Sequence, residues 1–152
     1  MVKFENSIHI ERNRADVFSF LLALENLAKW NYYILDVKKV TNGPPEVGSS
    51  YHLVRKSDEQ DLRIEELDDQ RKLVIKTPPE SRIQLQMTFI LEDEGSGTFL
   101  RDEWMLSAGL PTFLERFGAR SVRSAAAENL TKLKELLDHG RVTLQDGRIS
   151  QL

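Results

Sequence analysis

Six short stretches between residues 34 and 107 constrain the fold of this chain most. The segments that separate them are too short for anything but tight connections. Apolar and polar residues alternate along the six stretches, which is typical of strands. We expect strands near residues 34–41, 49–57, 61–67, 71–77, 82–92 and 97–107. The segments between them are short and rich in Gly, Pro, Asp, Ser and Asn, which favours tight turns. Parallel neighbours would need connections of a dozen or more residues, so the sequence predicts an antiparallel meander.

A further strand and two short helices are predicted at the start of the chain. Residues 3–11 alternate between apolar and polar side chains, which is typical of a half-buried strand and gives about seven strands in all. Asn13 can cap a helix with Asp16 at its third position. A second short helix is expected over residues 25–30. These elements indicate the α+β class.

A long helix over residues 111–138 is expected to cover the apolar face of the sheet, which needs such a cover. Pro111 suits the first turn of this helix, and Gly140 suits its C-terminal stop. Residues 118–127, at the centre of the helix, are mostly Gly, Ala and Ser. Such small side chains indicate either close contact between helix and sheet or an open space between them.

We expect one main domain over residues 1–140 and a C-terminal extension over residues 141–152. Asp146 and Gly147 form a hairpin signal between two short alternating stretches. The extension is therefore either an extra strand or hairpin, or a disordered tail.

Composition excludes several classes of function. The chain has 24 acidic and 21 basic residues, so no basic excess indicates a nucleic-acid partner. It has no cysteine, which excludes disulfides, thiolate zinc sites and a cysteine nucleophile. The N-terminus lacks the apolar region of a signal peptide, and no apolar run reaches the roughly 18 residues of a membrane span. We therefore expect a cytoplasmic protein without a membrane span.

The sequence gives no sign of a cofactor or a metal. It contains no Gly-rich phosphate loop, and its three histidines are far apart without the spacing of metal ligands. We therefore expect neither a cofactor nor a metal site.

Two charged residues fall on apolar faces of the predicted strands. Asp102 lies between Leu100 and Trp104 on its face, where a carboxylate must be paired, hydrated or neutralised. Arg55 follows Tyr51 on the apolar side of another strand. Each is either a polar anchor or acid–base group in an apolar pocket, or a structural charge that reaches water or forms an Asp–Arg pair.

A cavity between sheet and helix would be lined by inward residues of the strands and of the long helix. The predicted ligand-binding residues are Tyr51, Leu53, Arg55, Ile64, Ile75, Met87, Phe89, Asp102, Trp104, Phe117 and Ala126. An ordinary apolar core is the alternative for the same set.

Several stretches carry a family resemblance. They are SIHIERNRADVFSFL at 7–21, LENLAKWN at 24–31, PEVGSSYHLV at 45–54, GSGTFL at 95–100 and the long helix after AGLP at 108–111. With the order of the elements, they resemble the START-like (SRPBCC) superfamily, and within it the polyketide cyclase/dehydrase-like family, over residues 3–138. The chain departs from that pattern in having Asn13 and Arg14 where the family often has Pro, and Asp102 where it usually has an apolar or aromatic residue.

The resemblance implies a helix-grip fold, in which a curved sheet wraps around the long helix and encloses an apolar ligand. Relatives bind lipids, sterols, isoprenoid quinones or polyketides, and some catalyse cyclisation or dehydration. The leading hypothesis is a carrier, monomeric or homodimeric, for a small lipid, isoprenoid or polyketide-like molecule. The alternatives are a cyclase- or dehydratase-like enzyme with Asp102 as its catalytic acid or base, and a protein-interaction module. The sequence leaves open whether the chain is an enzyme, although it favours a carrier.

Overall fold

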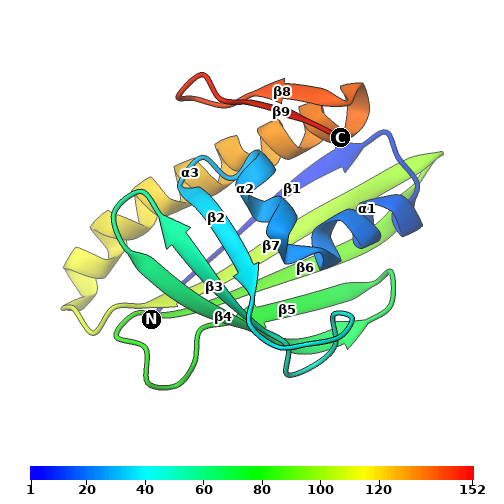
Figure 1. Cartoon of the computed structure of the whole chain (residues 1–152). Helices are drawn as coiled ribbons and strands as arrows, with labels where there is room; N and C mark the ends of the chain where they lie inside the picture. The colour runs from blue at the N-terminus through cyan, green and yellow to red at the C-terminus, as the bar shows by residue number, and fades with distance from the viewer.

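In the part of the chain that the structure describes, seven strands form one antiparallel sheet (Figure 1). The computed structural model describes the backbone of residues 1–152 and the side chains of residues 1–111 and 118–152. The strands are β1 (Val2–Ile10), β2 (Ile34–Lys39), β3 (Ser50–Arg55), β4 (Glu59–Asp68), β5 (Lys72–Lys76), β6 (Gln84–Glu94) and β7 (Gly97–Ser107). Their order is β1-β7-β6-β5-β4-β3-β2, so the predicted meander is confirmed.

Short helices connect β1 and β2, which lie at opposite edges of the sheet although they are consecutive strands. They are α1 (Arg14–Leu22), the 3-10 turn η1 (Leu24–Asn26) and α2 (Leu27–Trp30). Asn13 caps α1 as predicted, because its Oδ1 accepts the Asp16 backbone N–H at 2.8 Å. The helix expected over residues 25–30 is divided into η1 and α2.

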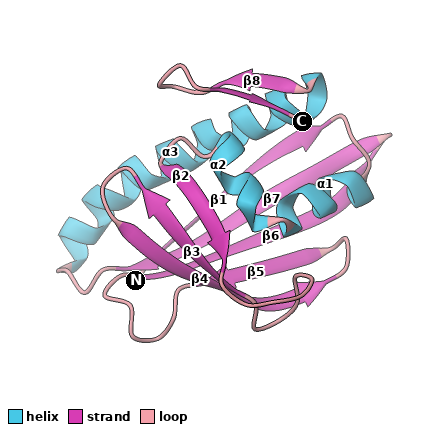
Figure 2. Ribbon diagram, viewed as in Figure 1, coloured by secondary structure: helices cyan, strands magenta, loops and turns pink.

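The long helix α3 (Thr112–His139) packs along the sheet beside β1, and Figure 2 shows it crossing the molecule from end to end. Gly140 ends it in the left-handed conformation at φ 79°, and its N–H donates to the Leu136 carbonyl at 2.8 Å. The C-terminal half of α3 presents Leu130, Leu133 and Leu137 to the core, where all three are buried. None of the described helices has the length and apolar character needed to cross a bilayer.

The sheet is bent by irregular pairing, and several predicted strand boundaries differ from the observed ones by up to two residues. Register shifts between Ile34 and Asp36 and between Ile64 and Glu66 are typical of bulges, which bend and twist a strand. The strand expected from residue 82 begins at Gln84. The Gln84 side chain donates to the Ser81 carbonyl at 2.6 Å and thereby fixes the preceding loop. Ile83, which falls within the predicted strand, therefore lies outside β6 and is exposed.

Residues after α3 form a small hairpin of β8 (Arg141–Thr143) and β9 (Ile149–Gln151). Val142 and Leu144 are buried against Leu136 of α3, in a cluster separate from the main core. The turn of the hairpin is held by Asp146, whose Oδ2 lies 2.9 Å from Nζ of Lys56. The hairpin is therefore attached both to α3 and to the segment after β3.

Two glycines offer a matched test of packing in this fold. A Cβ at Gly97 would overlap the Ile10 carbonyl oxygen and lie 2.8 Å from the His9 ring, whereas a Cβ at Gly118 would meet nothing within 4 Å. Gly97→Ala should therefore lower the free energy of unfolding by about 1–3 kcal/mol, since the backbone must shift. Gly118→Ala should raise it by about 0.5–1 kcal/mol, since Ala is preferred inside a helix. Urea unfolding of both variants measures the difference, and equal stabilities would contradict this packing.

Candidate functional site

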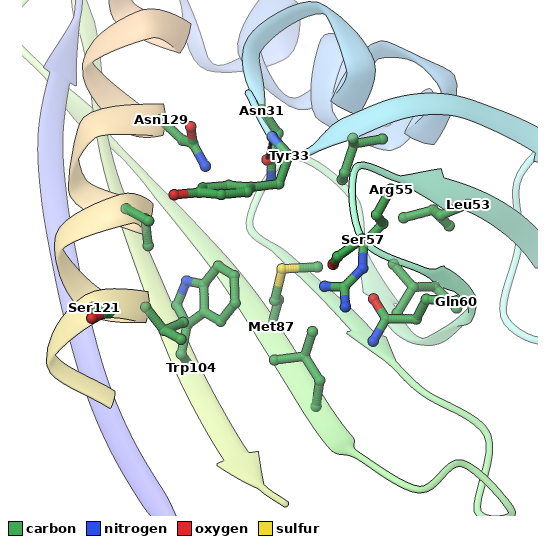
Figure 3. Close-up of a pocket in the computed structure, with 16 residues that line it drawn as sticks. Asn31, Tyr33, Leu53, Arg55, Ser57, Gln60, Met87, Trp104, Ser121 and Asn129 are labelled. Carbon is green, nitrogen blue, oxygen red and sulfur yellow. Dashed lines mark hydrogen bonds between the residues drawn. The ribbon is translucent and has the colours of Figure 1, made fainter. Parts of the chain in front are cut away.

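A cavity of about 320 Å³ lies between α3 and the sheet (Figure 3). This volume is within the range of small-molecule sites, roughly 300–1,000 Å³. Its walls come from the segment before β2, from β2, β3 and β4, from β6 and β7, and from α3. The lining residues are Asn31, Tyr33, Ile34, Leu53, Arg55, Ser57, Gln60, Leu62, Leu85, Met87, Trp104, Ser121, Val122, Ala125, Ala126 and Asn129.

The sheet provides an apolar floor for this cavity. Leu53, Leu62, Leu85 and Met87 are buried, because alternate residues of their strands point to the same face. Met87 on β6 stands opposite Trp104 on β7 in the strand register. The floor therefore offers a surface of aliphatic, thioether and indole groups.

The helix provides a roof of short side chains. Ser121, Val122, Ala125 and Ala126 lie on one face of α3, because residues three to five positions apart share a helix face. One turn further on, the same helix fills the core with leucines. The space is therefore left where α3 carries only small or short residues.

Polar groups surround the opening of the cavity. Tyr33 is 46% exposed, and Ser57 and Ser121 are also exposed, so the cavity reaches solvent between β2, the loop after β3 and α3. Among the described lining residues, only Tyr33 and Arg55 can ionise. In the described part of the chain, no group of His, Asp and Glu residues is arranged to hold a metal ion.

Arg55 is neutralised by its neighbour in sequence. Its Nε donates to Oδ1 of Asp58 at 2.6 Å, and its Nη2 donates to Oδ2 at 2.8 Å. These hydrogen bonds lower the pKa of Asp58. The Asp–Arg pair that the sequence left open is thus formed with Asp58 and not with Asp102.

Asp102 is buried beside Trp104 and does not line the cavity. Only 2% of its surface is exposed. Its Oδ2 accepts the indole N–H of Trp104 at 3.0 Å, and its Oδ1 accepts the Asn6 backbone N–H at 3.2 Å. Burial raises the pKa of Asp102 to about 6, although these two hydrogen bonds act in the opposite direction. In this arrangement, the carboxylate fixes the orientation of an indole that does line the cavity.

The structure brings together part of the residue set predicted from sequence. Leu53, Arg55, Met87, Trp104 and Ala126 line the cavity. The others that the structure describes lie elsewhere in the interior, each at 2% exposure or less: Tyr51, Ile64, Ile75, Phe89 and Asp102. Phe117 lies outside the residues whose side chains are described.

Sequence reasoning missed several polar lining residues, notably Asn31, Gln60 and Asn129. Asn129 left a signal, since it comes three residues after Ala126 and four before Leu133, on the apolar face of the helix. Asn31 lies in a turn without periodicity, where the sequence gives no indication of a side-chain direction.

The chain matches the family model described as polyketide cyclase / dehydrase and lipid transport over residues 1–138. None of the curated proteins matches it.

Solved structures of similar fold include the Aha1 dimer from Colwellia psychrerythraea, with 19% identity, a TM-score of 0.67, and 92% of this chain and 98% of that chain covered. A START superfamily protein from Mycobacterium smegmatis has 13% identity and a TM-score of 0.72, covering 89% of this chain and 98% of its own. The di-domain ARO/CYC protein BexL from the BE-7585A biosynthetic pathway has 15% identity and a TM-score of 0.73, covering 89% of this chain and 46% of its own. At these identities the likeness concerns the fold alone.

The raised pKa of Asp102 predicts a pH dependence of stability. The folded protein holds this proton up to about pH 6, whereas the unfolded chain releases it near 3.8. The contribution of Asp102 to the free energy of unfolding should therefore fall as the pH rises from about 4 to about 6, by an amount on the order of 3 kcal/mol. Asp102→Asn should lack this component, because it carries no charge at any pH.

Urea unfolding of both proteins between pH 4.5 and 7.5 measures the effect. The stability of Asp102→Asn relative to the natural chain should rise through this range. Comparing the two proteins cancels the contributions of the other carboxylates, which both share. Parallel stability curves would contradict the assigned environment of Asp102.

Proposed function

Because the chain belongs to the polyketide cyclase / dehydrase and lipid transport family, we propose that it binds and carries a small hydrophobic molecule in the cavity beneath α3. The observation that carries the proposal is the contrast between the two walls, an apolar floor under a helix face of short side chains. This family has a ligand-binding fold, and the cavity lies between its sheet and its long helix.

The lining supports binding through apolar contact. A ligand that buries about 200 Å² of apolar surface would gain roughly 5 kcal/mol at about 25 cal/mol per Å². The cost of immobilising the ligand is subtracted from this gain. The rigid, buried side chains of the floor keep the cost on the protein side small.

The lining also favours a carrier over an enzyme. An acid or base catalyst must come within hydrogen-bond reach of its substrate. Among the described lining residues there is no Asp, Glu, His or Cys, and Arg55 is already paired with Asp58. Asp102, the predicted catalytic residue, is separated from the lining set and has hydrogen bonds to both oxygens.

Filling the cavity should abolish binding. Ala126 is 4% exposed and lines the cavity, so Ala126→Leu places a larger side chain in the space that a ligand would occupy. We expect the dissociation constant for N-phenyl-1-naphthylamine to be at least tenfold higher in this variant. This compound is a neutral probe whose emission rises in apolar surroundings. Fluorescence titration measures it.

Ser124→Leu is the matched control, because Ser124 is exposed on the same helix and does not line the cavity. It should bind the probe as the natural chain does. Equal affinities in the two leucine variants, both folded by circular dichroism, would overturn the proposed site.

A further inference from the structure

We infer that Asn129 is a hydrogen-bond donor that selects ligands with a neutral acceptor oxygen, such as the carbonyl of a ketone, ester or quinone. The inference rests on the proposed function and narrows its ligand class. It starts from a polar side chain that is almost completely buried and yet borders the cavity.

Asn129 is 4% exposed and stands on α3 one turn after the short residues of the cavity roof. A buried amide normally has partners for its hydrogen-bonding groups, because burying an unpaired polar group removes its hydration and destabilises the protein. Partners are therefore expected both for Oδ1 and for Nδ2 of Asn129.

The orientation of the amide follows from its one described partner. Oδ1 of Asn129 accepts the Tyr32 backbone N–H at 3.3 Å. A backbone N–H can only donate, so the oxygen must face Tyr32 and the Nδ2 group must face away from it. Among the described residues, Nδ2 has no hydrogen-bond acceptor. Figure 3 shows this amide directed into the cavity beside Tyr33.

Tyr32, whose N–H orients Asn129, is itself held through its carbonyl, which belongs to the next peptide group. Nη2 of Arg148 donates to the Tyr32 carbonyl at 2.9 Å. Arg148 is in turn held by Asp146, with 2.9 Å between its Nε and Oδ2 of the carboxylate. The donor is thus presented to the cavity before any ligand arrives, which reduces the ordering cost of binding.

The charges around the cavity favour a neutral ligand over an anion. Arg55, the cation in the described lining, already gives two hydrogen bonds to Asp58. An anion between the apolar floor and α3 would therefore lose hydration without gaining an unpaired cation. A carbonyl oxygen needs only one donor, which Nδ2 provides.

Three compounds of one ring skeleton test this inference. They are fluorene, 9-fluorenone, which replaces its CH2 by a carbonyl, and the anion 9-fluorenecarboxylate. Displacement of N-phenyl-1-naphthylamine gives the affinity of each. The natural chain should bind 9-fluorenone about fivefold to tenfold more tightly than fluorene, as expected for one net hydrogen bond, and should bind the anion most weakly.

Asn129→Leu should bring the fluorenone-to-fluorene ratio to about one, and Asn129→Ala provides a second variant should the leucine not fold. Glu128→Leu is the control, because Glu128 precedes Asn129 on α3 but is exposed and does not line the cavity. It should keep the preference of the natural chain. Each ratio compares two ligands on the same protein, so a loss of stability alone does not change it.

Equal binding of fluorene and 9-fluorenone by the natural chain would overturn the role of Asn129 while leaving the carrier proposal intact. That role is also overturned if the preference survives in the Asn129 variants, if Glu128→Leu removes it, or if the anion binds best. If the natural chain binds neither N-phenyl-1-naphthylamine nor, by isothermal titration calorimetry, any of the three ring compounds, the proposed function itself is overturned.

Discussion

The need to bury one face of a bent antiparallel sheet under helices governs this molecule. The 28-residue helix α3 runs along the apolar face of the sheet, and α1, η1 and α2 also bury side chains in the same core. In its C-terminal half, α3 meets this need with Leu130, Leu133 and Leu137, which are all buried. Nearer its N-terminus, Ala125 and Ala126 leave space above the same face. Stability and binding are thus assigned to different turns of one helix, which explains how a cavity is compatible with a well-packed core.

The walls of the cavity depend on buried polar contacts as well as on apolar packing. The carboxylate of Asp102 accepts the indole N–H of Trp104, and the amide oxygen of Asn129 accepts the backbone N–H of Tyr32. Apolar contacts have little directional preference, whereas hydrogen bonds set the orientation of an aromatic ring or an amide. The buried carboxylate has a cost, visible in its raised pKa. The chain retains it where an indole would otherwise have a buried N–H without a partner.

The elements of the fold could be predicted from the sequence because their signals are local. Alternation and turn residues located the strands, and Asn13 and Gly140 marked helix ends whose geometry the structure confirms. The cavity was less accessible, because alternation reveals the face of a strand but not the depth of a residue on it. Met87 and Phe89 share a face of β6, yet only Met87 lines the cavity. The pairing of Asn129 with Tyr32 joins residues 97 positions apart, which no local pattern encodes.

The C-terminal hairpin connects this site to a part of the chain beyond the family match, which ends at residue 138. Val142 and Leu144 form their own small cluster with Leu136, so the main core does not depend on them. Arg148, in contrast, reaches the Tyr32 carbonyl, and Asp146 reaches Lys56 beside the cavity opening. Substitutions in the turn of the hairpin can therefore alter the opening without altering the sheet. Under the proposed function, this separation would let the ligand preference of such a chain change while its fold stays the same.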